Sequence, residues 1–182
     1  MIKRLLATLF PIVFMPYMIF AISLGTIQNN PSQYEKVFEN ADLTAYVDTN
    51  SIESLRYSPP YYTLKAKYYQ ISYSQEKILE FNVVFDYDYN YSLETISKKI
   101  IKDYPYYSDD EKVKLLIQSM DKNSGMTCCI NEAHGWTLDG SDAGTRYPYH
   151  RTKCGTRSIA YKLGLCIFSK YYDRPFGISA IK

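Results

Sequence analysis

The side chains best suited to chemistry lie in the C-terminal third of the 182-residue chain, where all four cysteines and both histidines occur. In an exported chain, an even number of cysteines first predicts disulfides. A bond between the neighbours Cys128 and Cys129 would be strained, so two pairings remain. Cys128 pairs with Cys154 and Cys129 with Cys166, or Cys128 pairs with Cys166 and Cys129 with Cys154. Either pairing staples the C-terminal region with two disulfides, each contributing about 2–4 kcal/mol to stability.

The same cysteines lie near His134 and His150, which raises a zinc site and a cysteine nucleophile as alternatives. An adjacent cysteine pair differs from the spaced pair that lets two thiolates face one zinc ion. A nucleophile needs a reduced thiol in an activating motif, and no recognised motif surrounds these cysteines. We therefore predict no bound metal and no cofactor.

Carboxylates near the histidines offer another alternative, an exported hydrolase that uses His134 or His150 with Asp139 and Asp142. The two aspartates flank Gly140, however, and aspartate beside glycine is typical of a turn. We therefore keep the hydrolase as the alternative and assign no catalytic residue.

Residues 86–90 read D-x-D-x-N, like the start of a calcium-binding EF-hand loop. The motif fails at its sixth place, where Tyr91 replaces glycine, and at its twelfth, where Ser97 replaces glutamate. A strand explains the same spacing. The chain has no Gly-rich phosphate loop, no G-x-S-x-G elbow and no H-E-x-x-H motif, which lowers the expectation of an enzyme.

These side chains must be positioned by a sheet, and residues 79–91 form its clearest predicted strand. The odd positions hold Leu79, Phe81, Val83, Phe85, Tyr87, Tyr89 and Tyr91, and all the even ones except Val84 are polar. Such a period of two places the apolar groups on one face of a sheet. Residues 61–73 predict a second strand, joined to the first by a polar turn, so the two form a hairpin.

Residues 108–120 predict an amphipathic helix. Ser108 and Glu111 fit the S-x-x-E capping box, and acidic residues fill the first turn. The apolar residues that follow recur at helical spacing, namely Val113, Leu116, Ile117 and Met120. We expect their stripe to lie against the sheet.

The remaining segments complete the predicted fold. Residues 43–48 predict a strand, residues 92–102 fit either a strand or a helix, and residues 159–168 predict a late buried strand. Together the elements predict the α+β class, with an antiparallel β-sheet, one packed amphipathic helix and a disulfide-stapled C-terminal region.

The N-terminus has the pattern of an export signal. Lys3 and Arg4 precede an uncharged, mostly apolar run over residues 5–25. Ala21 and Ser23 suit a cleavage position, and we place the cleavage after Ser23. The alternative is an uncleaved anchor, since the run matches the roughly 20 residues of a spanning helix. A membrane partner is predicted only in that case.

The predicted organisation is a signal peptide at residues 1–23, a linker at residues 24–34 and a single α+β domain at residues 35–182. Both readings of the N-terminus place the domain outside the cytoplasm, in the periplasm, at the outer surface or in the medium.

The charges exclude one class of partner and suggest another. Without Lys3 and Arg4 the chain has 19 basic and 19 acidic residues, which argues against nucleic acid. Residues 143–182 nevertheless carry 8 basic residues and one acidic one. Either this part neutralises the acidic residues 80–142, or it forms a basic surface for an anionic partner. The candidate basic surface consists of Arg146, Arg151, Lys153 and Arg157.

The 20 tyrosines are the second unusual feature of the composition. Tyrosine fits a sheet with one face in water, and it is also common on binding surfaces. Composition alone leaves both explanations open.

Residues 45–52, Ala-Tyr-Val-Asp-Thr-Asn-Ser-Ile, are followed by a long polar and aromatic strand. This stretch resembles the start of small surface-adhesin E-like proteins of Gram-negative bacteria, which open with a "yvD-x-x-S-I" strand and turn after an export signal. The resemblance covers residues 35–73, and the Glu39-Asn40-Ala41 segment departs from the family's aromatic start. It implies an envelope-associated, non-enzymatic protein, which in some members binds host proteins.

The sequence thus predicts an exported binding or structural module of the cell envelope, adhesin-like and without catalytic activity. Its predicted partner is a protein or an anionic surface. The alternatives are the hydrolase described above and a membrane-anchored subunit of an envelope complex.

Overall fold

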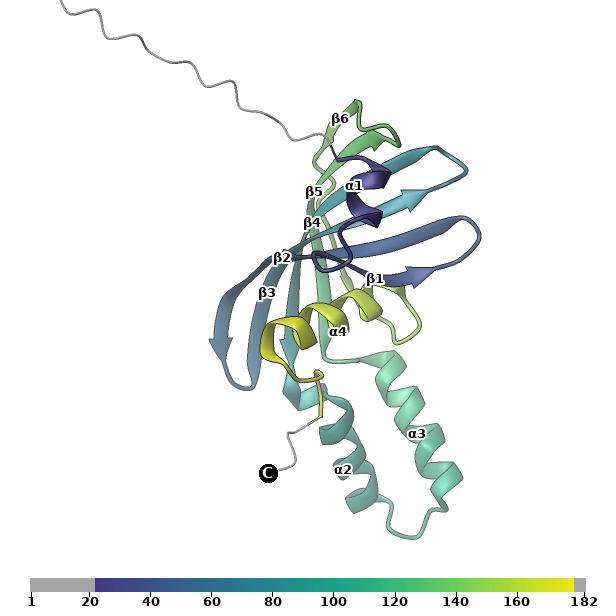
Figure 1. Ribbon diagram of the computed structural model, residues 1–182. Coiled ribbons are helices and arrows are strands. Elements are labelled where there is room, and N and C mark those ends of the chain that lie inside the picture. The colour runs from purple at the N-terminus through teal and green to yellow at the C-terminus, as the bar shows by residue number, and fades with distance from the viewer. Residues whose placement is uncertain (1–21, 179–182) are drawn as a thin grey trace, which may run out of the picture.

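Segments of alternating polar and apolar residues pair into an antiparallel sheet in residues 22–178, the part of the chain that this computed structural model describes (Figure 1). Its seven strands are β1 (Tyr34–Glu39), β2 (Leu43–Ser58), β3 (Tyr61–Ser72), β4 (Lys77–Asp88), β5 (Met126–Thr137), β6 (Asp142–Arg146) and β7 (His150–Lys153). Strands β1 to β6 follow one another across the sheet in chain order, and β7 pairs with the half of β5 that β6 leaves open.

The predicted central hairpin is confirmed. Strands β3 and β4 pair from Tyr61 opposite Asp88 to Ser72 opposite Lys77 without a break in register. Strand β2 is longer than residues 43–48 and continues through two irregularities in its pairing with β3. A turn at Pro59 and Pro60 then reverses the chain. The α+β class follows, since helices pack on a largely antiparallel sheet.

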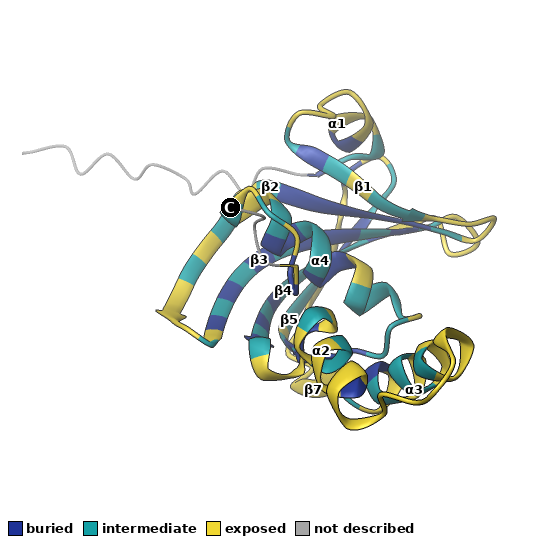
Figure 2. Ribbon diagram, turned by 90° about the horizontal axis from the view of Figure 1, so that it is seen from below, coloured by how far each residue is buried: buried dark blue, intermediate teal, exposed yellow. Residues whose placement is uncertain are grey.

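Alternation along these strands gives the sheet two different faces. The α4 face carries Leu64 and Phe85, which are fully buried in a core shared with helix α4 (Ile159–Tyr172). The α1 face carries Tyr69 and Trp136, which pack in a smaller core with Ile27 of helix α1 (Leu24–Gln28). Figure 2 shows the resulting alternation of buried and partly buried residues along the central strands.

Residues 159–168 form a helix, so the prediction of a late strand there is wrong. Ser158 caps the helix, because its Oγ accepts a hydrogen bond from the backbone N–H of Tyr161 at 3.1 Å. The buried residues of α4 are Leu163, Gly164, Ile167 and Phe168, which lie on one side of a helix. A continuous apolar run does not distinguish a buried strand from a buried helix, which explains the error.

The predicted amphipathic helix forms as α3 (Asp109–Lys122), and its capping box is confirmed. The side chain of Ser108 accepts from the backbone N–H of Glu111, whose carboxylate accepts from the backbone N–H of Ser108. Its expected position is wrong, however. Val113 and Ile117 are 52% and 48% exposed, so the apolar stripe does not lie on the sheet.

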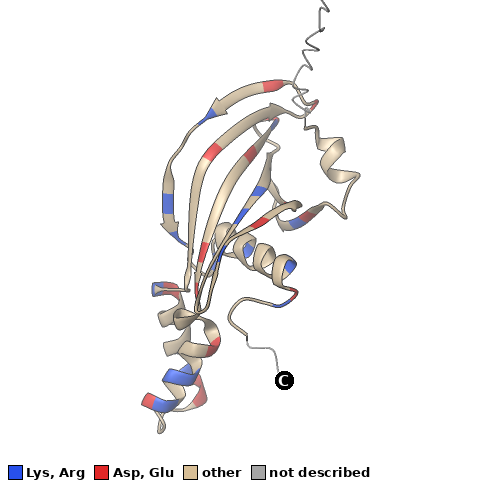
Figure 3. Ribbon diagram, turned by 90° about the vertical axis from the view of Figure 1, so that its left-hand side faces the viewer, with Lys and Arg blue, Asp and Glu red and all other residues tan. Residues whose placement is uncertain are grey.

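Helix α3 packs against α2 (Leu93–Asp103), which settles the ambiguous segment as a helix. The chain leaves β4 through a short 3₁₀ turn, η1 (Tyr89–Tyr91), and returns into β5 after α3. The two helices therefore form a hairpin that projects beyond the end of the sheet (Figure 1). Figure 3 shows charges of both signs along this hairpin. The helices that pack on the sheet are α4 on one face and the short α1 on the other.

The two predicted disulfides are absent, and the four cysteines are free thiols. Neighbouring residues on a strand point to opposite faces, which separates Cys128 from Cys129 on β5. Cys128 shares the α4-face core with Cys154, and Cys166 of α4 packs against the same core. Cys129 pairs with Val84 and faces the other side. Both expected patterns require Cys129 to reach Cys154 or Cys166, and the sheet lies between them.

The segment expected as a linker contains helix α1, whose Ile27 is fully buried. Of the predicted export segment, only Ile22 and Ser23 belong to the described residues. Within residues 22–178, no helix has the length and apolar character needed to cross a bilayer.

Candidate functional site

A groove of about 750 Å³ opens on the α1 face of the sheet. Helix α1 and the strand β1 contribute to one side of it, and strands β3 to β6 contribute the rest. The lining residues are Ile22, Thr26, Tyr34, Lys67, Tyr69, Glu80, Asn82, Glu132, His134, Trp136 and Thr145. We call this the α1-face groove.

Strand register brings its polar side chains together in two rows. In one row, Glu80 of β4 lies between Tyr69 of β3 and His134 of β5. In the next row, Asn82 lies between Lys67 and Glu132. Partners across a sheet project to the same face, so residues from three strands converge on one surface.

Two hydrogen-bonded pairs occupy these rows. The Nζ atom of Lys67 lies 2.8 Å from Oε1 of Glu80 in an ion pair. The amide of Asn82 donates to Oε2 of Glu132, also at 2.8 Å. Each carboxylate retains acceptor capacity beyond these contacts, since an ionised carboxylate accepts several hydrogen bonds.

Aromatic rings line the groove beside the polar rows. Tyr34 and Tyr69 meet edge to face, with ring centroids 5.6 Å apart. Burial, supported by the negative charge of Glu80, raises the pKa of Tyr69, so this phenol stays protonated. Trp136 is 5% exposed, and its indole N–H has no hydrogen-bond partner within the described residues.

His134 lies at the β6 side of the groove. Its Nδ1 atom is hydrogen-bonded to the hydroxyl of Thr145, and its ring lies 4.3 Å from that of Trp136, centroid to centroid. Its Nε2 atom is 2.9 Å from Oδ1 of Asp142 but lacks the alignment of a hydrogen bond. The contact therefore has the distance of an ion pair, which requires a protonated imidazole.

The structure brings together only part of the predicted histidine and aspartate group. His134 and Asp142 are in contact, whereas His150 pairs with Ile130, which packs against the α4-face core. His150 therefore faces the opposite side of the sheet from His134. Asp139 instead stabilises a turn, where a hydrogen bond from the Thr137 hydroxyl lowers its pKa.

The four predicted basic residues lie on two strands and in one turn. Arg151 and Lys153 lie two residues apart on β7, and both line a second groove on the α1 face. Arg151 pairs with Asp86 at 2.8 Å. Arg146 is exposed on β6, and Arg157 is exposed in the turn before α4.

The aspartates of the EF-hand-like run accept hydrogen bonds from other residues of the protein. Asp86 accepts a hydrogen bond from Thr63 at 2.8 Å in addition to its contact with Arg151. Asp88 caps the turn that follows β4 by accepting from the backbone N–H of Asn90. In the part of the chain that the structure describes, no group of three or more His, Cys, Asp or Glu side chains is placed to hold a metal ion.

The sequence prediction missed most of the groove. Glu80 and Asn82 are even-numbered residues of the clearest strand, where they indicated only a polar face. Lys67 and Glu132 become their neighbours through pairing between distant segments. The one signal of this groove in the sequence was Trp136, the single tryptophan of the chain. It lies two residues after His134, which was already a candidate site residue.

A scan against protein-family models finds no match, and searches of curated proteins and of solved structures find none either.

Proposed function

We propose that the protein is a non-catalytic binding module of the cell envelope and that it holds a polyhydroxylated ligand, such as a saccharide, in the α1-face groove. The observation that carries this proposal is the convergence of donors, acceptors and aromatic rings in one groove. Lys67 and Asn82 supply donors, Glu80 and Glu132 supply acceptors, and Trp136 supplies an aromatic ring beside them.

A hydroxyl group both donates and accepts hydrogen bonds. Several hydroxyls on one ligand therefore match a groove in which donors and acceptors alternate over short distances. The Trp136 N–H gives a further reason, because a buried donor without a partner costs about 1–3 kcal/mol. A ligand oxygen that reaches it removes that cost.

The distribution of charge disfavours an anionic ligand, because Glu132 is bonded to the Asn82 amide and has no cationic partner among the lining residues. The positive charge of Lys67 is compensated by Glu80 at 2.8 Å. The rings of Tyr34, Tyr69 and Trp136 line the groove but are only 7%, 5% and 5% exposed, so they offer a small apolar surface to the C–H groups of a sugar ring. The volume of about 750 Å³ falls within the range of small-molecule sites.

The cellular part of the proposal is supported by the sequence. Basic residues followed by an apolar run are typical of exported chains, and residues 35–73 resemble the start of surface-adhesin E-like proteins. The envelope is rich in saccharides, which agrees with the ligand class inferred from the groove.

Fluorescence of Trp136 tests this function, because the chain has no other tryptophan. We expect maltose, cellobiose or N,N′-diacetylchitobiose to change the emission in a saturable way. Glu132→Gln keeps the shape but removes a charged acceptor, so affinity should fall about tenfold, as expected for a hydrogen bond to a charged group. Glu53→Gln is the matched control, since Glu53 pairs with Lys65 outside the groove. Unchanged wild-type emission with all three sugars would contradict the proposal.

One observation favours hydrolysis as a second candidate function, namely the 2.9 Å contact between His134 and Asp142. A carboxylate beside an imidazole orients a general base and stabilises its protonated form. In this candidate, Asp142 holds the ring at Nε2, and a water must take the place of the Thr145 hydroxyl at Nδ1 before His134 can remove its proton.

The hydrolase is tested by the release of p-nitrophenol from p-nitrophenyl acetate and p-nitrophenyl glycosides. If the protein releases p-nitrophenol, we expect His134→Gln to lower the rate of release by about 100-fold or more, the usual contribution of a general base. His150→Gln is the control on the opposite face and should retain the rate. Equal rates for wild type and His134→Gln would remove this candidate.

A further inference from the structure

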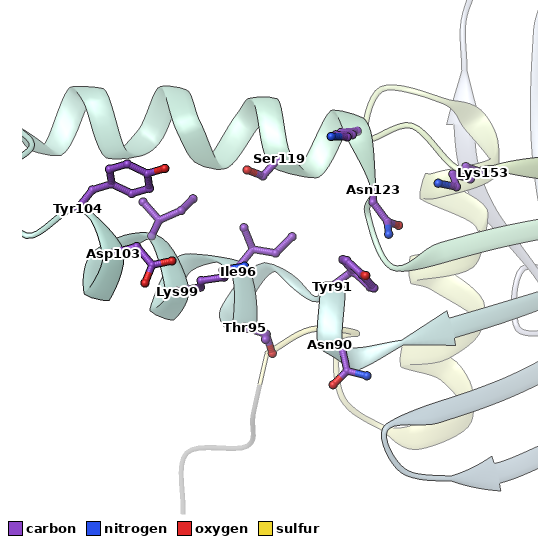
Figure 4. Close-up of a pocket in the computed structure, with 12 residues that line it drawn as sticks. Asn90, Tyr91, Thr95, Ile96, Lys99, Asp103, Tyr104, Ser119, Asn123 and Lys153 are labelled. Atoms are coloured by element: carbon purple, nitrogen blue, oxygen red, sulfur yellow. The ribbon is translucent and has the colours of Figure 1, made fainter.

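A second groove follows the lower end of the α1 face and continues between α2 and α3. Its inner part has about 610 Å³ and lies between the two helices (Figure 4). Its outer part has about 320 Å³ and lies over β3, β4 and β7. The two parts share Tyr91, Asn123 and Lys153, so they form one elongated groove. We call it the basic groove.

Cationic side chains from separate elements line this groove. Lys99 comes from α2, Lys122 from α3 and Lys153 from β7. Within residues 22–178, none of the three ammonium groups lies in a salt bridge. Figure 4 shows Lys99 between the helices and Lys153 at the end nearest the sheet. Three charges from three elements thus line one groove, and none of them has an ion-pair partner among the described residues.

The outer part adds two guanidinium groups. Arg56 lies over the ring of Tyr61, with its Cζ atom 5.0 Å from the centroid. Arg151 is held by Asp86 at 2.8 Å. Both side chains are therefore fixed in place by a neighbour, and guanidinium groups suit carboxylate, sulfate and phosphate oxygens.

Three carboxylates also line the basic groove, and they restrict the ligand. Asp86 is bound to Arg151, and Asp88 caps the turn after β4. Asp103 lies toward the free end of the hairpin (Figure 4). Five cationic and three anionic side chains line the groove, so its net charge is positive but the positive charge is not continuous along it. Such a pattern suits anionic groups spaced along a chain and disfavours the continuous charge of nucleic acid or polyphosphate.

We propose that the basic groove binds a linear anionic polysaccharide, with its carboxylate or sulfate groups on Lys99, Lys122 and Lys153. This inference is independent of the α1-face groove, because the two grooves share no lining residue. The exposed Tyr91 and Tyr104 give the sugar rings apolar contact between the anionic groups.

The test is binding of the protein to polygalacturonate and to dextran sulfate, with neutral dextran as the uncharged control. Polygalacturonate carries carboxylates and dextran sulfate carries sulfates, so a comparison of the two affinities shows which anionic group the groove prefers. We expect binding to one or both at low salt, none to dextran, and an affinity that falls as salt rises. Lys99→Gln/Lys122→Gln should bind about tenfold more weakly, as expected for the loss of two exposed charge contacts.

Lys102→Gln/Lys114→Gln is the matched control, because it changes the same two helices by the same charge outside the groove. The proposal requires this control to retain wild-type affinity. Equal losses in both double variants would mean that only net charge matters and would overturn it. Tighter binding of polyphosphate than of either polysaccharide, or no binding to either polysaccharide, would also overturn it.

Discussion

At the scale of single residues, Gly164 determines how closely α4 approaches the sheet. A Cβ atom at this position would lie 2.2 Å from Sδ of Met126 and 3.0 Å from a ring carbon of Phe85. The hydroxyl of Tyr87 donates to the carbonyl of Gly164 at 2.8 Å in the same buried place. The close packing and the buried hydrogen bond therefore both depend on a glycine, which has no side chain, at position 164.

We predict that Gly164→Ala destabilises the protein by about 1–2 kcal/mol, because overpacking a core costs up to about 3 kcal/mol. The helical preference of alanine offsets only part of this cost, about 1 kcal/mol. The midpoint of urea unfolding measures the change. Gly155→Ala is the control, because nothing lies within 4 Å of its added Cβ atom. An equal midpoint for wild type and Gly164→Ala would show that α4 moves away at no cost.

The residue scale also shows which parts of the site were predictable. His134 and Asp142 are close in sequence and lie on one hairpin, so a local pattern was enough to associate them. Lys67, Glu80 and Glu132 meet only because β3, β4 and β5 pair in one register. That register depends on contacts between distant segments, which no single stretch of sequence contains.

At the scale of elements, α3 has strong local signals and little support from the rest of the molecule. Met120 is its one buried residue among those described, and its main packing partner is α2. Its own capping box and first-turn charges therefore matter more to its stability than they would in a helix packed on the core. Glu111 contributes to both, and the hydrogen bonds it accepts from Ser108 lower its pKa.

We predict that Ser108→Ala frays α3 and costs it about 1 kcal/mol of local stability. Hydrogen exchange followed by mass spectrometry should show faster exchange in residues 109–114 and unchanged exchange in β3 and β4. Ser119→Ala is the control within the same helix, since it leaves the cap intact. If exchange in β3 and β4 also accelerated, α3 would have to be coupled to the sheet more strongly than its contacts indicate.

The elements that the sequence predicted correctly are those with complete local signals. β4 has strict alternation, and α3 has a capping box with helical spacing. α4 was predicted as a strand because its residues are apolar on most sides, which removes the periodicity that identifies an amphipathic helix. The helix is recognised only in the structure. There one side of α4 packs on the sheet, and Ser158 caps the helix by accepting a hydrogen bond from the backbone N–H of Tyr161.

At the scale of the whole molecule, buried ionisable groups make stability depend on pH. Burial raises the pKa of Cys128 and of Cys154 to about 12, and it raises the pKa of Tyr87 well above its ordinary value. In the unfolded chain a thiol ionises near its ordinary pKa, about 8.5. The stabilisation is therefore complete below that pH and is lost as the pH rises toward 12.

We predict that the free energy of unfolding is level from pH 7 to 8 and declines from pH 9 to 11. Urea unfolding at these pH values measures it. Cys128→Val/Cys154→Val removes two of the responsible groups and should show a shallower decline, with Cys166, whose pKa burial raises to about 11, and the tyrosines supplying the remainder. Identical slopes for this variant and the wild type would mean that the two thiols do not contribute.

The way in which the α2–α3 hairpin joins the sheet has a consequence for protein engineering. The backbone N–H of Asp88, at the end of β4, donates to the carbonyl of Gly125, just before β5, at 2.7 Å. The 36 residues between them thus begin and end one hydrogen bond apart. A two-residue turn can close such a gap, leaving all the strand pairings in place. The hairpin is therefore a candidate for excision, or for grafting between neighbouring strands of another antiparallel sheet together with Lys99 and Lys122, once the contacts of Tyr89 with Phe168 and Phe176 are replaced.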